Sequence, residues 1–194
     1  MSTFLESAPN NWHYHLVVAS VPKDGSPFTD NFLLSVERPL NYWSQIYNFT
    51  APVKVYIEVS RSDGRLVASI SVSGETIIPC SRCLEPAKIV TAGHLKYFFS
   101  LKPNKYTKKE EDEVKPKDDQ EIIFLDSWEN EIDLVPRIWE VLITSLPVTA
   151  FCFEGCKGLC PRCGINLNES SCSCEKDDRD PRFDVLRSFV KDKK

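Results

Sequence analysis

The sequence is poor in glycine, with 7 glycines against 13 prolines among its 194 residues. So few glycines argue against a glycine-rich nucleotide-binding fold, in which the backbone must approach phosphates closely. The patterns of a nucleophile elbow, a phosphate-binding loop and an HExxH zinc protease are also absent. No acid–base pair stands out, and the histidines (His13, His15 and His94) have no ligand spacing to the cysteines. We therefore predict that the protein is not an enzyme and has no small-molecule substrate.

Long apolar runs are absent as well. No stretch approaches the roughly 20 apolar residues of a membrane-spanning helix. The first residues, MSTFLESAPNNWHYH, lack the basic start and the apolar stretch of a secretory signal. These absences predict a cytoplasmic protein with no membrane partner, in which cysteines stay reduced.

Positive charge is in the minority, because the formal net charge is −4. Nonspecific affinity for nucleic acid comes from neutralising phosphates with lysine and arginine. The sequence therefore does not indicate a general polyanion binder. Any contact with RNA has to be a local patch or to be made through a protein partner.

The chain does contain eight cysteines in four close pairs. The pairs are Cys80-x-x-Cys83, Cys152-x-x-x-Cys156, Cys160-x-x-Cys163 and Cys172-x-Cys174. Four pairs suit two sites of four thiolates each, and zinc is the metal that favours a tetrahedral thiolate shell. We predict two zinc ions; disulfides, iron–sulfur clusters and free thiols are the alternatives. Four cysteines close each site and leave no position for a catalytic water.

The grouping of the pairs follows from their separation along the chain. A short, turn-rich stretch joins Cys163 to Cys172, and a short loop closes at little entropic cost. The favoured local site therefore comprises Cys160, Cys163, Cys172 and Cys174. The favoured long-range site then comprises Cys80, Cys83, Cys152 and Cys156. A competing grouping, Cys80 and Cys83 with Cys160 and Cys163, stays open.

The remaining sequence predicts an α+β fold, an antiparallel β-sheet packed by one or two helices and carrying the cysteine knuckles. Residues Val53 to Val59 alternate apolar and polar side chains, and a second alternating strand begins at Leu66. Asp63-Gly64 between them is typical of a hairpin turn. Further strands are expected at residues 12–19, 32–36, 92–101 and 121–125.

Two helices are expected toward the C-terminal end. The first runs from Asp133, as the N-cap, to about Leu146, and Pro147 ends it. The second begins after Asp180, with Pro181 in the first helical position. Three regions result: a β-rich segment (1–50), a sheet-and-helix core with the first knuckle and a charged loop at 102–120 (51–147), and a cysteine-rich region with the C-terminal helix (148–194).

The combination of motifs resembles the YceD family, bacterial proteins associated with accumulation of large-subunit (23S) ribosomal RNA. The resemblance covers residues 53–189, and residues 1–50 match weakly. It rests on CSRCLEP at 80–86, IDL at 132–134, LP at 146–147, CKGLCPRCG at 156–164, NLN at 166–168, and DPRF at 180–183 with Leu186.

This resemblance implies a noncatalytic ribosome-biogenesis factor that supports the accumulation or processing of 23S rRNA. Implied partners are precursor rRNA, the large ribosomal subunit or an associated assembly protein. An alternative function is a zinc- or redox-responsive regulatory binding protein, whose thiolates release metal when oxidised.

Cationic residues near the cysteines are the candidates for contact with RNA or a partner, because arginine binds phosphate with paired donors. They are Arg82, Lys157, Arg162, Arg179 and Arg182. The alternative for Arg82 and Arg162 is that they only offset the charge of the thiolates.

Overall fold

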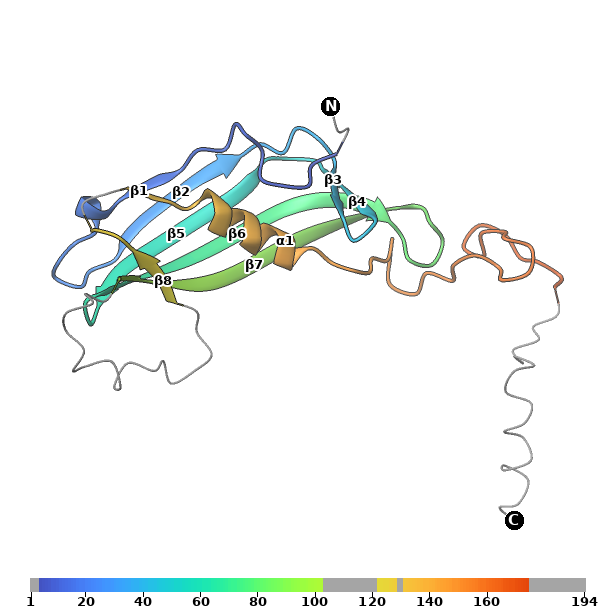
Figure 1. Ribbon diagram of the computed structural model, residues 1–194. Coiled ribbons are helices and arrows are strands. Elements are labelled where there is room, and N and C mark those ends of the chain that lie inside the picture. The colour runs from blue at the N-terminus through green and yellow to red at the C-terminus, as the bar shows by residue number, and fades with distance from the viewer. Residues whose placement is uncertain (1–3, 103–121, 129–130, 175–194) are drawn as a thin grey trace, which may run out of the picture.

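The computed structural model describes residues 4–102, 122–128 and 131–174. Its main element is a seven-stranded β-sheet, and one α-helix of the described residues, α1 (Val135–Ser145), packs on it (Figure 1). The strands of this sheet are β2 (Phe28–Leu34), β3 (Leu40–Tyr42), β4 (Gln45–Phe49), β5 (Val53–Ser62), β6 (Arg65–Pro79), β7 (Pro86–Leu101) and β8 (Ile122–Leu125). A separate two-stranded sheet pairs β1 (His15–Val17) with β9 (Glu131–Asp133).

The long strand β6 organises the large sheet. One of its edges pairs with β7 from Leu66↔Phe99 to Pro79↔Pro86. Its other edge pairs first with β5 and then with β4. Outside these strands, β2 pairs with β5, and β8 pairs with β7. Every pairing in the sheet is antiparallel except that of β7 with β8, so the expected antiparallel sheet is confirmed with one parallel edge.

The β5–β6 hairpin follows the prediction closely. Its turn consists of Asp63 and Gly64, with φ angles of 49° and 73°, as a two-residue hairpin turn with the twist of the flanking strands requires. Alternate residues from Val53 to Val59 are buried. The same is true of β6 from Leu66 to Val72.

Several predicted strand bounds are wrong. The segment 12–19 forms only the three residues of β1, followed by a 3₁₀ helix at Val18–Ser20. The partner strand β9 is equally short. Trp12 lies outside this ladder, and its indole N–H donates to the Ser35 carbonyl at 2.8 Å. Strand β2 begins before the expected residue 32 and ends at Leu34, and β7 begins at Pro86 instead of residue 92. The three strands β2, β3 and β4 from the first fifty residues join the same sheet as β5, β6 and β7.

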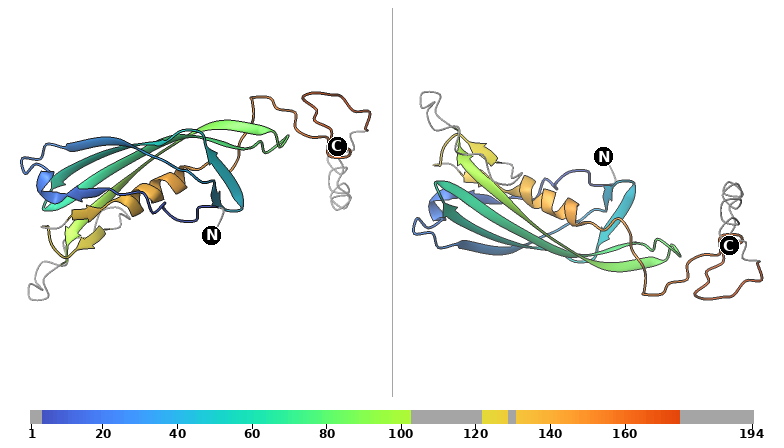
Figure 2. Two further views of the ribbon diagram at one scale, coloured as in Figure 1. Left: turned by 90° about the horizontal axis from the view of Figure 1, so that it is seen from above. Right: turned by 90° about the horizontal axis from the view of Figure 1, so that it is seen from below.

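Helix α1 covers one face of the large sheet over β6 and β7, and the small β1–β9 sheet lies on the same side (Figure 2). Its residues Ile138, Val141 and Leu142 are fully buried, and burial of such side chains contributes about 1.5–3 kcal/mol each. Gly93 of β7 permits this packing. A Cβ atom built there would lie 2.7 Å from the Ser145 Cβ.

The predicted N-cap of this helix is one residue off. Leu134 is the N-cap residue, because Asp133 is paired with His15 as the last residue of β9. The Asp133 carboxylate nevertheless accepts a hydrogen bond from the Val135 N–H at 2.9 Å. The expected end of the helix before Pro147 is confirmed.

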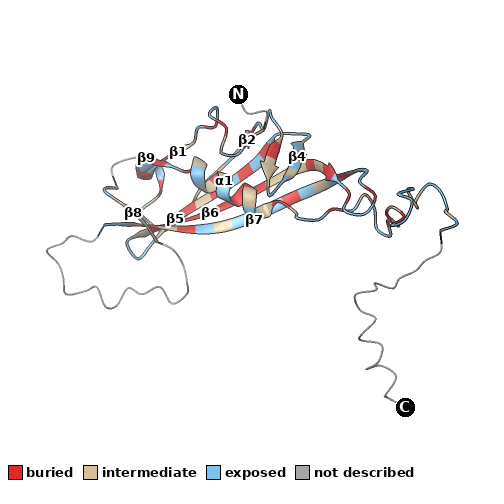
Figure 3. Cartoon of the chain, turned by 45° about the vertical axis from the view of Figure 1, so that its right-hand side comes forward, coloured by how far each residue is buried: buried red, intermediate tan, exposed pale blue. Residues whose placement is uncertain are grey.

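The buried apolar residues form two clusters, and alternation of buried and exposed residues is visible along the strands (Figure 3). The larger cluster lies between the sheet and α1. The smaller cluster joins Leu40, Tyr47 and Ile78 to cysteines. Within the described residues, no helix has the length and apolar character needed to cross a membrane. The predicted charged loop beyond Lys102 and the predicted helix after Pro181 lie outside the described residues.

Candidate metal centres

The first cysteine group forms at the tip of the β6–β7 hairpin. The turn supplies Cys80 and Cys83, and the chain after α1 supplies Cys152 and Cys156. The four Sγ atoms lie within 4.8 Å of one another. The sulfur of Cys80 is 3.8 Å from that of Cys156. The sulfur of Cys83 is 3.5 Å from that of Cys152.

Backbone hydrogen bonds shape this turn so that both of its sulfurs face the same point. The Cys80 N–H donates to the Glu85 carbonyl at 2.8 Å, and the Leu84 N–H donates to the Cys80 carbonyl at 3.0 Å. The Arg82 N–H points at the Cys80 sulfur at 3.5 Å. Leu84 has a φ angle of 65°, a left-handed conformation that glycine adopts most easily.

The chain after α1 is tied to this turn by reciprocal bonds. The Ser81 N–H donates to the Ala150 carbonyl at 2.7 Å. In return, the Ala150 N–H donates to the Ser81 hydroxyl oxygen at 3.1 Å. The Tyr47 hydroxyl of β4 donates to the Pro147 carbonyl at 3.0 Å. The sheet, the hairpin and the end of the helix therefore meet at the first group.

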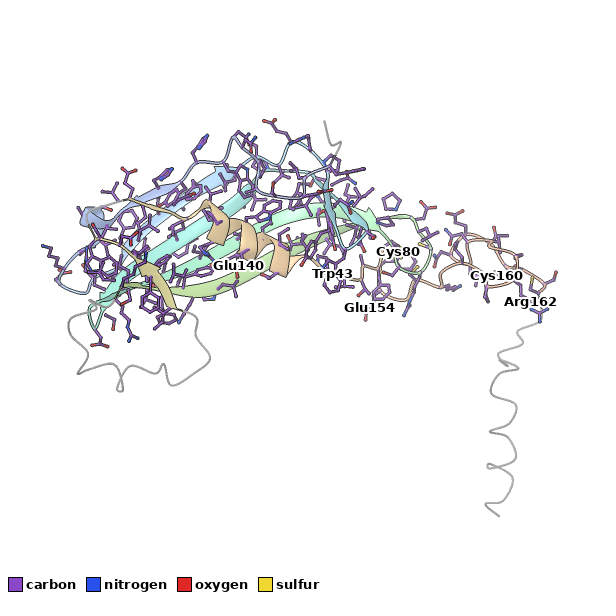
Figure 4. All side chains as sticks on the ribbon, in the orientation of Figure 1. Trp43, Cys80, Glu140, Glu154, Cys160 and Arg162 are labelled. Carbon is purple, nitrogen blue, oxygen red and sulfur yellow. The ribbon has the colours of Figure 1, made fainter. Side chains whose placement is uncertain are left out.

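The second cysteine group lies farther from the sheet, where Figure 4 labels Cys160 and Arg162. It consists of Cys160, Cys163, Cys172 and Cys174, whose Sγ atoms also lie within 4.8 Å of one another. The Cys172 and Cys160 sulfurs are 3.5 Å apart. Cys163 is exposed, whereas in the first group Cys80, Cys83 and Cys156 are all buried.

The two C-x-x-C turns share one backbone pattern. In the second, the Cys160 N–H donates to the Ile165 carbonyl at 2.8 Å, and the Gly164 N–H donates to the Cys160 carbonyl at 2.9 Å. Gly164 has a φ angle of 72° and stands where the first turn has Leu84. Both turns are therefore knuckles of the kind that aims two sulfurs at one ion.

The structure brings the cysteines together in the grouping that their chain separation favours, and it does not form the competing knuckle-with-knuckle group. None of the eight cysteines is in a disulfide. A disulfide requires sulfurs about 2.05 Å apart, well below the 3.5 Å and 3.8 Å between the sulfurs in these groups. A tetrahedral shell with Zn–S bonds near 2.3 Å places its sulfurs about 3.8 Å apart. Each group could therefore hold a metal ion.

The thiols within each group differ in acidity. Burial opposes ionisation of Cys80, but N–H groups of Cys83, Arg82 and Cys152 lower its pKa to about 6. Burial and the neighbouring Cys83, Cys156 and Cys80 sulfurs raise the pKa of Cys152 to about 12. In the second group, backbone donors lower the pKa of Cys160 to about 6. A side-chain hydrogen bond with Cys163, together with burial, raises the pKa of Cys174 to about 12. Crowded thiolates repel one another, so a divalent cation is what would let all four ionise.

Asn168, from the segment between Cys163 and Cys172, bonds to the first group and was not foreseen from the sequence. Its side-chain N–H donates to the Cys156 sulfur at 3.3 Å, and its amide oxygen accepts the Lys157 N–H at 2.7 Å. Burial alone would raise the pKa of Cys156, but the Asn168 bond helps to lower it. The signal available in the sequence was the Asn166-Leu167-Asn168 motif, whose two asparagines bond to each other.

The loop before the second group packs directly on the first knuckle. The Leu159 N–H donates to the Arg82 carbonyl at 3.0 Å. A Cβ atom built on Gly158 would lie 2.9 Å from that carbonyl oxygen, and its φ angle of 76° also favours glycine. Only glycine fits this contact.

The predicted contact residues have different surroundings. The Arg82 guanidinium donates to the Cys156 carbonyl at 2.8 Å and lies 4.6 Å from the centre of the Phe151 ring. Lys157 and Arg162 are exposed. Arg179 and Arg182 lie outside the described residues. His15 faces Glu131 at 4.0 Å, and no histidine joins either cysteine group.

A family model described as "Large ribosomal RNA subunit accumulation protein YceD" matches residues 68–190. The chain belongs to the YceD family. The matched region includes both cysteine groups, β7 and α1. The resemblance inferred from the motifs is therefore confirmed.

Curated relatives carry related names. "Large ribosomal RNA subunit accumulation protein YCED homolog 1, chloroplastic" of Arabidopsis thaliana is 26% identical over 156 residues, covering 70% of this chain and 47% of the relative. The protein of the same name in Zea mays is 31% identical over 143 residues, covering 64% and 49%. An uncharacterized protein of Mycobacterium tuberculosis is 34% identical over 110 residues, covering 56% and 47%. The chain thus spans about half the length of the curated relatives it matches. No solved structure matches.

Proposed function

We propose that the protein is a noncatalytic ribosome-biogenesis factor that supports accumulation or processing of 23S rRNA in the large ribosomal subunit. The observation that carries this proposal is the family match over residues 68–190, whose description names large ribosomal RNA accumulation. Its partners would be precursor rRNA, the large subunit or an associated assembly protein. The proposed setting is the bacterial cytoplasm; mycobacterial relatives support a bacterial setting, whereas the plant relatives are named chloroplastic.

The proposed cofactor is zinc, with one ion in each cysteine group. Cys80, Cys83, Cys152 and Cys156 would hold the first ion, and Cys160, Cys163, Cys172 and Cys174 the second. Four thiolates complete a tetrahedral zinc shell, and such a closed site cross-links the chain instead of activating water. Elemental analysis of the purified protein should give two zinc ions per chain. One ion or none, or the visible absorption of an iron–sulfur cluster, would contradict this assignment.

The decisive test of the function is the ratio of 23S to 16S rRNA, with precursor lengths, in cells depleted of the protein. A selective fall in 23S rRNA or a build-up of its precursors is expected, with recovery when the wild-type chain is supplied. An unchanged ratio with normal precursors would remove the ribosome-biogenesis proposal.

The accessibility of the second group favours one further candidate, a redox-responsive regulator. Cys163 is exposed, and Cys172 and Cys174 are only half-buried. This exposure matters because oxidants react with accessible thiolates. Mild peroxide should then release one zinc ion of two, with reversible loss of partner binding. Retention of both ions under those conditions would exclude this regulator.

A further inference from the structure

An exposed apolar surface adjoins the first cysteine group. Leu84 of the knuckle is 66% exposed, and Phe151 and Phe153 of the chain after α1 are 48% and 53% exposed. Together with Arg82 we call these residues the Arg82 surface. Leu84 follows Cys83 in the chain, and Phe151 and Phe153 flank Cys152, so all three lie beside cysteines of the first group. Exposed apolar side chains close to one site indicate an interaction surface.

Arg82 is held in place although its side chain is exposed. Its Nη1 atom donates to the Cys156 carbonyl at 2.8 Å, and its Cζ lies 4.6 Å from the Phe151 ring centre. The backbone carbonyl of Arg82 accepts the Leu159 N–H at 3.0 Å. An arginine ordered in advance loses little conformational entropy when it binds.

The conformation of Leu84 also sets this surface apart. Its φ angle of 65° is left-handed, and the second knuckle has glycine at the equivalent position, with a φ angle of 72°. A bulky residue in this conformation costs about 1–2 kcal/mol. The knuckle itself requires this conformation, as Gly164 shows, but neither the turn nor packing requires a bulky side chain there, because Leu84 is 66% exposed.

We propose that the Arg82 surface stacks on unpaired RNA bases, so that the protein binds single-stranded segments of ribosomal RNA in preference to duplexes. This inference rests on the proposed function for the choice of RNA. Bases in single strands stack on aromatic rings and on guanidinium planes. The Phe151 ring is 48% exposed with the Arg82 guanidinium over it, so the pair supplies both kinds of group at one place. The net charge of −4 argues against binding driven by phosphates. Lys157, next to Cys156, is an exposed cation that could contact one phosphate.

The first test measures affinity of the zinc-loaded full chain for a fluorescent single-stranded RNA and for the same sequence closed into a hairpin duplex. The single strand should bind at least 10-fold more tightly. The logarithm of the affinity should fall only shallowly with the logarithm of salt concentration, since few phosphates are neutralised. Equal or tighter binding of the duplex, or a steep salt dependence, would overturn the proposal.

Two variants locate the contact. Phe151→Ala should weaken single-strand binding about 10-fold, as expected for loss of one stacked base. The matched control is Phe124→Ala, because Phe124 is 51% exposed and belongs to β8, which pairs with the end of β7 opposite the first cysteine group. Arg82→Lys should also weaken binding, since lysine keeps the charge but lacks the planar group. Zinc content and circular dichroism must match the wild type for each variant.

Equal affinities of Phe151→Ala and Phe124→Ala for the single strand would overturn the proposal. So would loss of binding to a large-subunit protein with RNA binding intact, because the surface would then be a protein interface. The cellular assay separates this inference from the proposed function. If depletion lowers 23S rRNA but supplying the Phe151→Ala variant restores its level fully, the stacking proposal is wrong and the proposed function stands. If the variant loses RNA binding but depletion leaves 23S rRNA unchanged, the function fails.

Discussion

Leu84 and Gly164 occupy equivalent positions in two knuckles that share their backbone hydrogen bonds, yet only one position holds glycine. Replacing Leu84 with glycine should relieve the left-handed strain of about 1–2 kcal/mol. Glycine also has more conformational freedom to lose on folding, and this lowers the free energy of unfolding by about 0.5–1 kcal/mol. We expect a net stabilisation of about 0.5–1 kcal/mol, measured by chemical denaturation of the zinc-loaded protein.

Leu84→Ala serves as the control for this substitution, because alanine keeps the conformational strain and removes only an exposed side chain. It should leave stability nearly unchanged. The reverse substitution, Gly164→Leu, should introduce strain and weaken metal retention in the second group. A loss of stability in Leu84→Gly would show that the Leu84 side chain contributes to the fold.

Replacing Asn168 should weaken metal binding by the first cysteine group. Its N–H donor stabilises the charged form of Cys156, and loss of such outer hydrogen bonds reduces metal affinity about 10–100-fold. Asn168→Ala should show this loss in competition with a chromophoric chelator. Asn168→Asp keeps the acceptor for Lys157 but places a negative charge beside the thiolate, so its loss should be greater. Wild-type affinity in Asn168→Ala would exclude this role.

At the scale of elements, the contact between α1 and β7 depends on Gly93. A Cβ there would lie 2.9 Å from the Val141 carbonyl as well as close to Ser145. Gly93→Ala should therefore force the helix away from the sheet and destabilise the protein by about 1–3 kcal/mol, measured by urea unfolding.

Gly74 of β6 provides the matched control for Gly93, since a Cβ there would meet Phe49 and Val53 side chains at 3.4 Å, an ordinary contact. Gly74→Ala should be neutral or stabilising by up to about 1 kcal/mol. Equal destabilisation by both substitutions would show that the close helix–strand contact is not the cause.

Elements governed by local pattern could be predicted from the sequence. The β5–β6 hairpin was recognisable because its alternation and its Asp-Gly turn agree. The β3–β4 hairpin has no such signal, since its turn residues Trp43 and Ser44 adopt φ angles of 52° and 61° without glycine. The start of β7 was hidden by Pro86, which is tolerated as the first residue of a strand.

The candidate site divides in the same way. The short separations along the chain were enough to suggest which cysteines group together. The positions of Asn168 and Gly158 depend on how the second loop packs against Arg82. Contacts of this kind form only when distant segments of the folded chain pack together, so no periodic pattern in the sequence indicates them.

For the whole molecule, the two groups should contribute unequally to stability. The first joins β6, β7 and the chain after α1 within the smaller apolar cluster, whereas the second is bound within residues 160–174. Metal bound only by the native state stabilises that state directly. Cys83→Ser should lower the melting temperature by about 10 °C or more. Cys172→Ser should lower it by less than about 3 °C, with increased hydrogen exchange confined to residues 157–174.

These melting temperatures are compared by circular dichroism, with the zinc content of each variant measured alongside. Each variant should retain one zinc ion. Equal losses of melting temperature in Cys83→Ser and Cys172→Ser would contradict the unequal division between the groups.

The turn that carries Cys80 and Cys83 also aligns the longest ladder of the sheet, from Pro79↔Pro86 to Leu66↔Phe99. A slip of this ladder by one residue would send every β7 side chain to the opposite face. An ion bound at the tip would admit one alignment only, because both sulfurs must also meet those of Cys152 and Cys156. Metal binding during folding would then select the correct strand register. Zinc scarcity would lower the yield of correctly paired chains before it destabilised protein that had already folded.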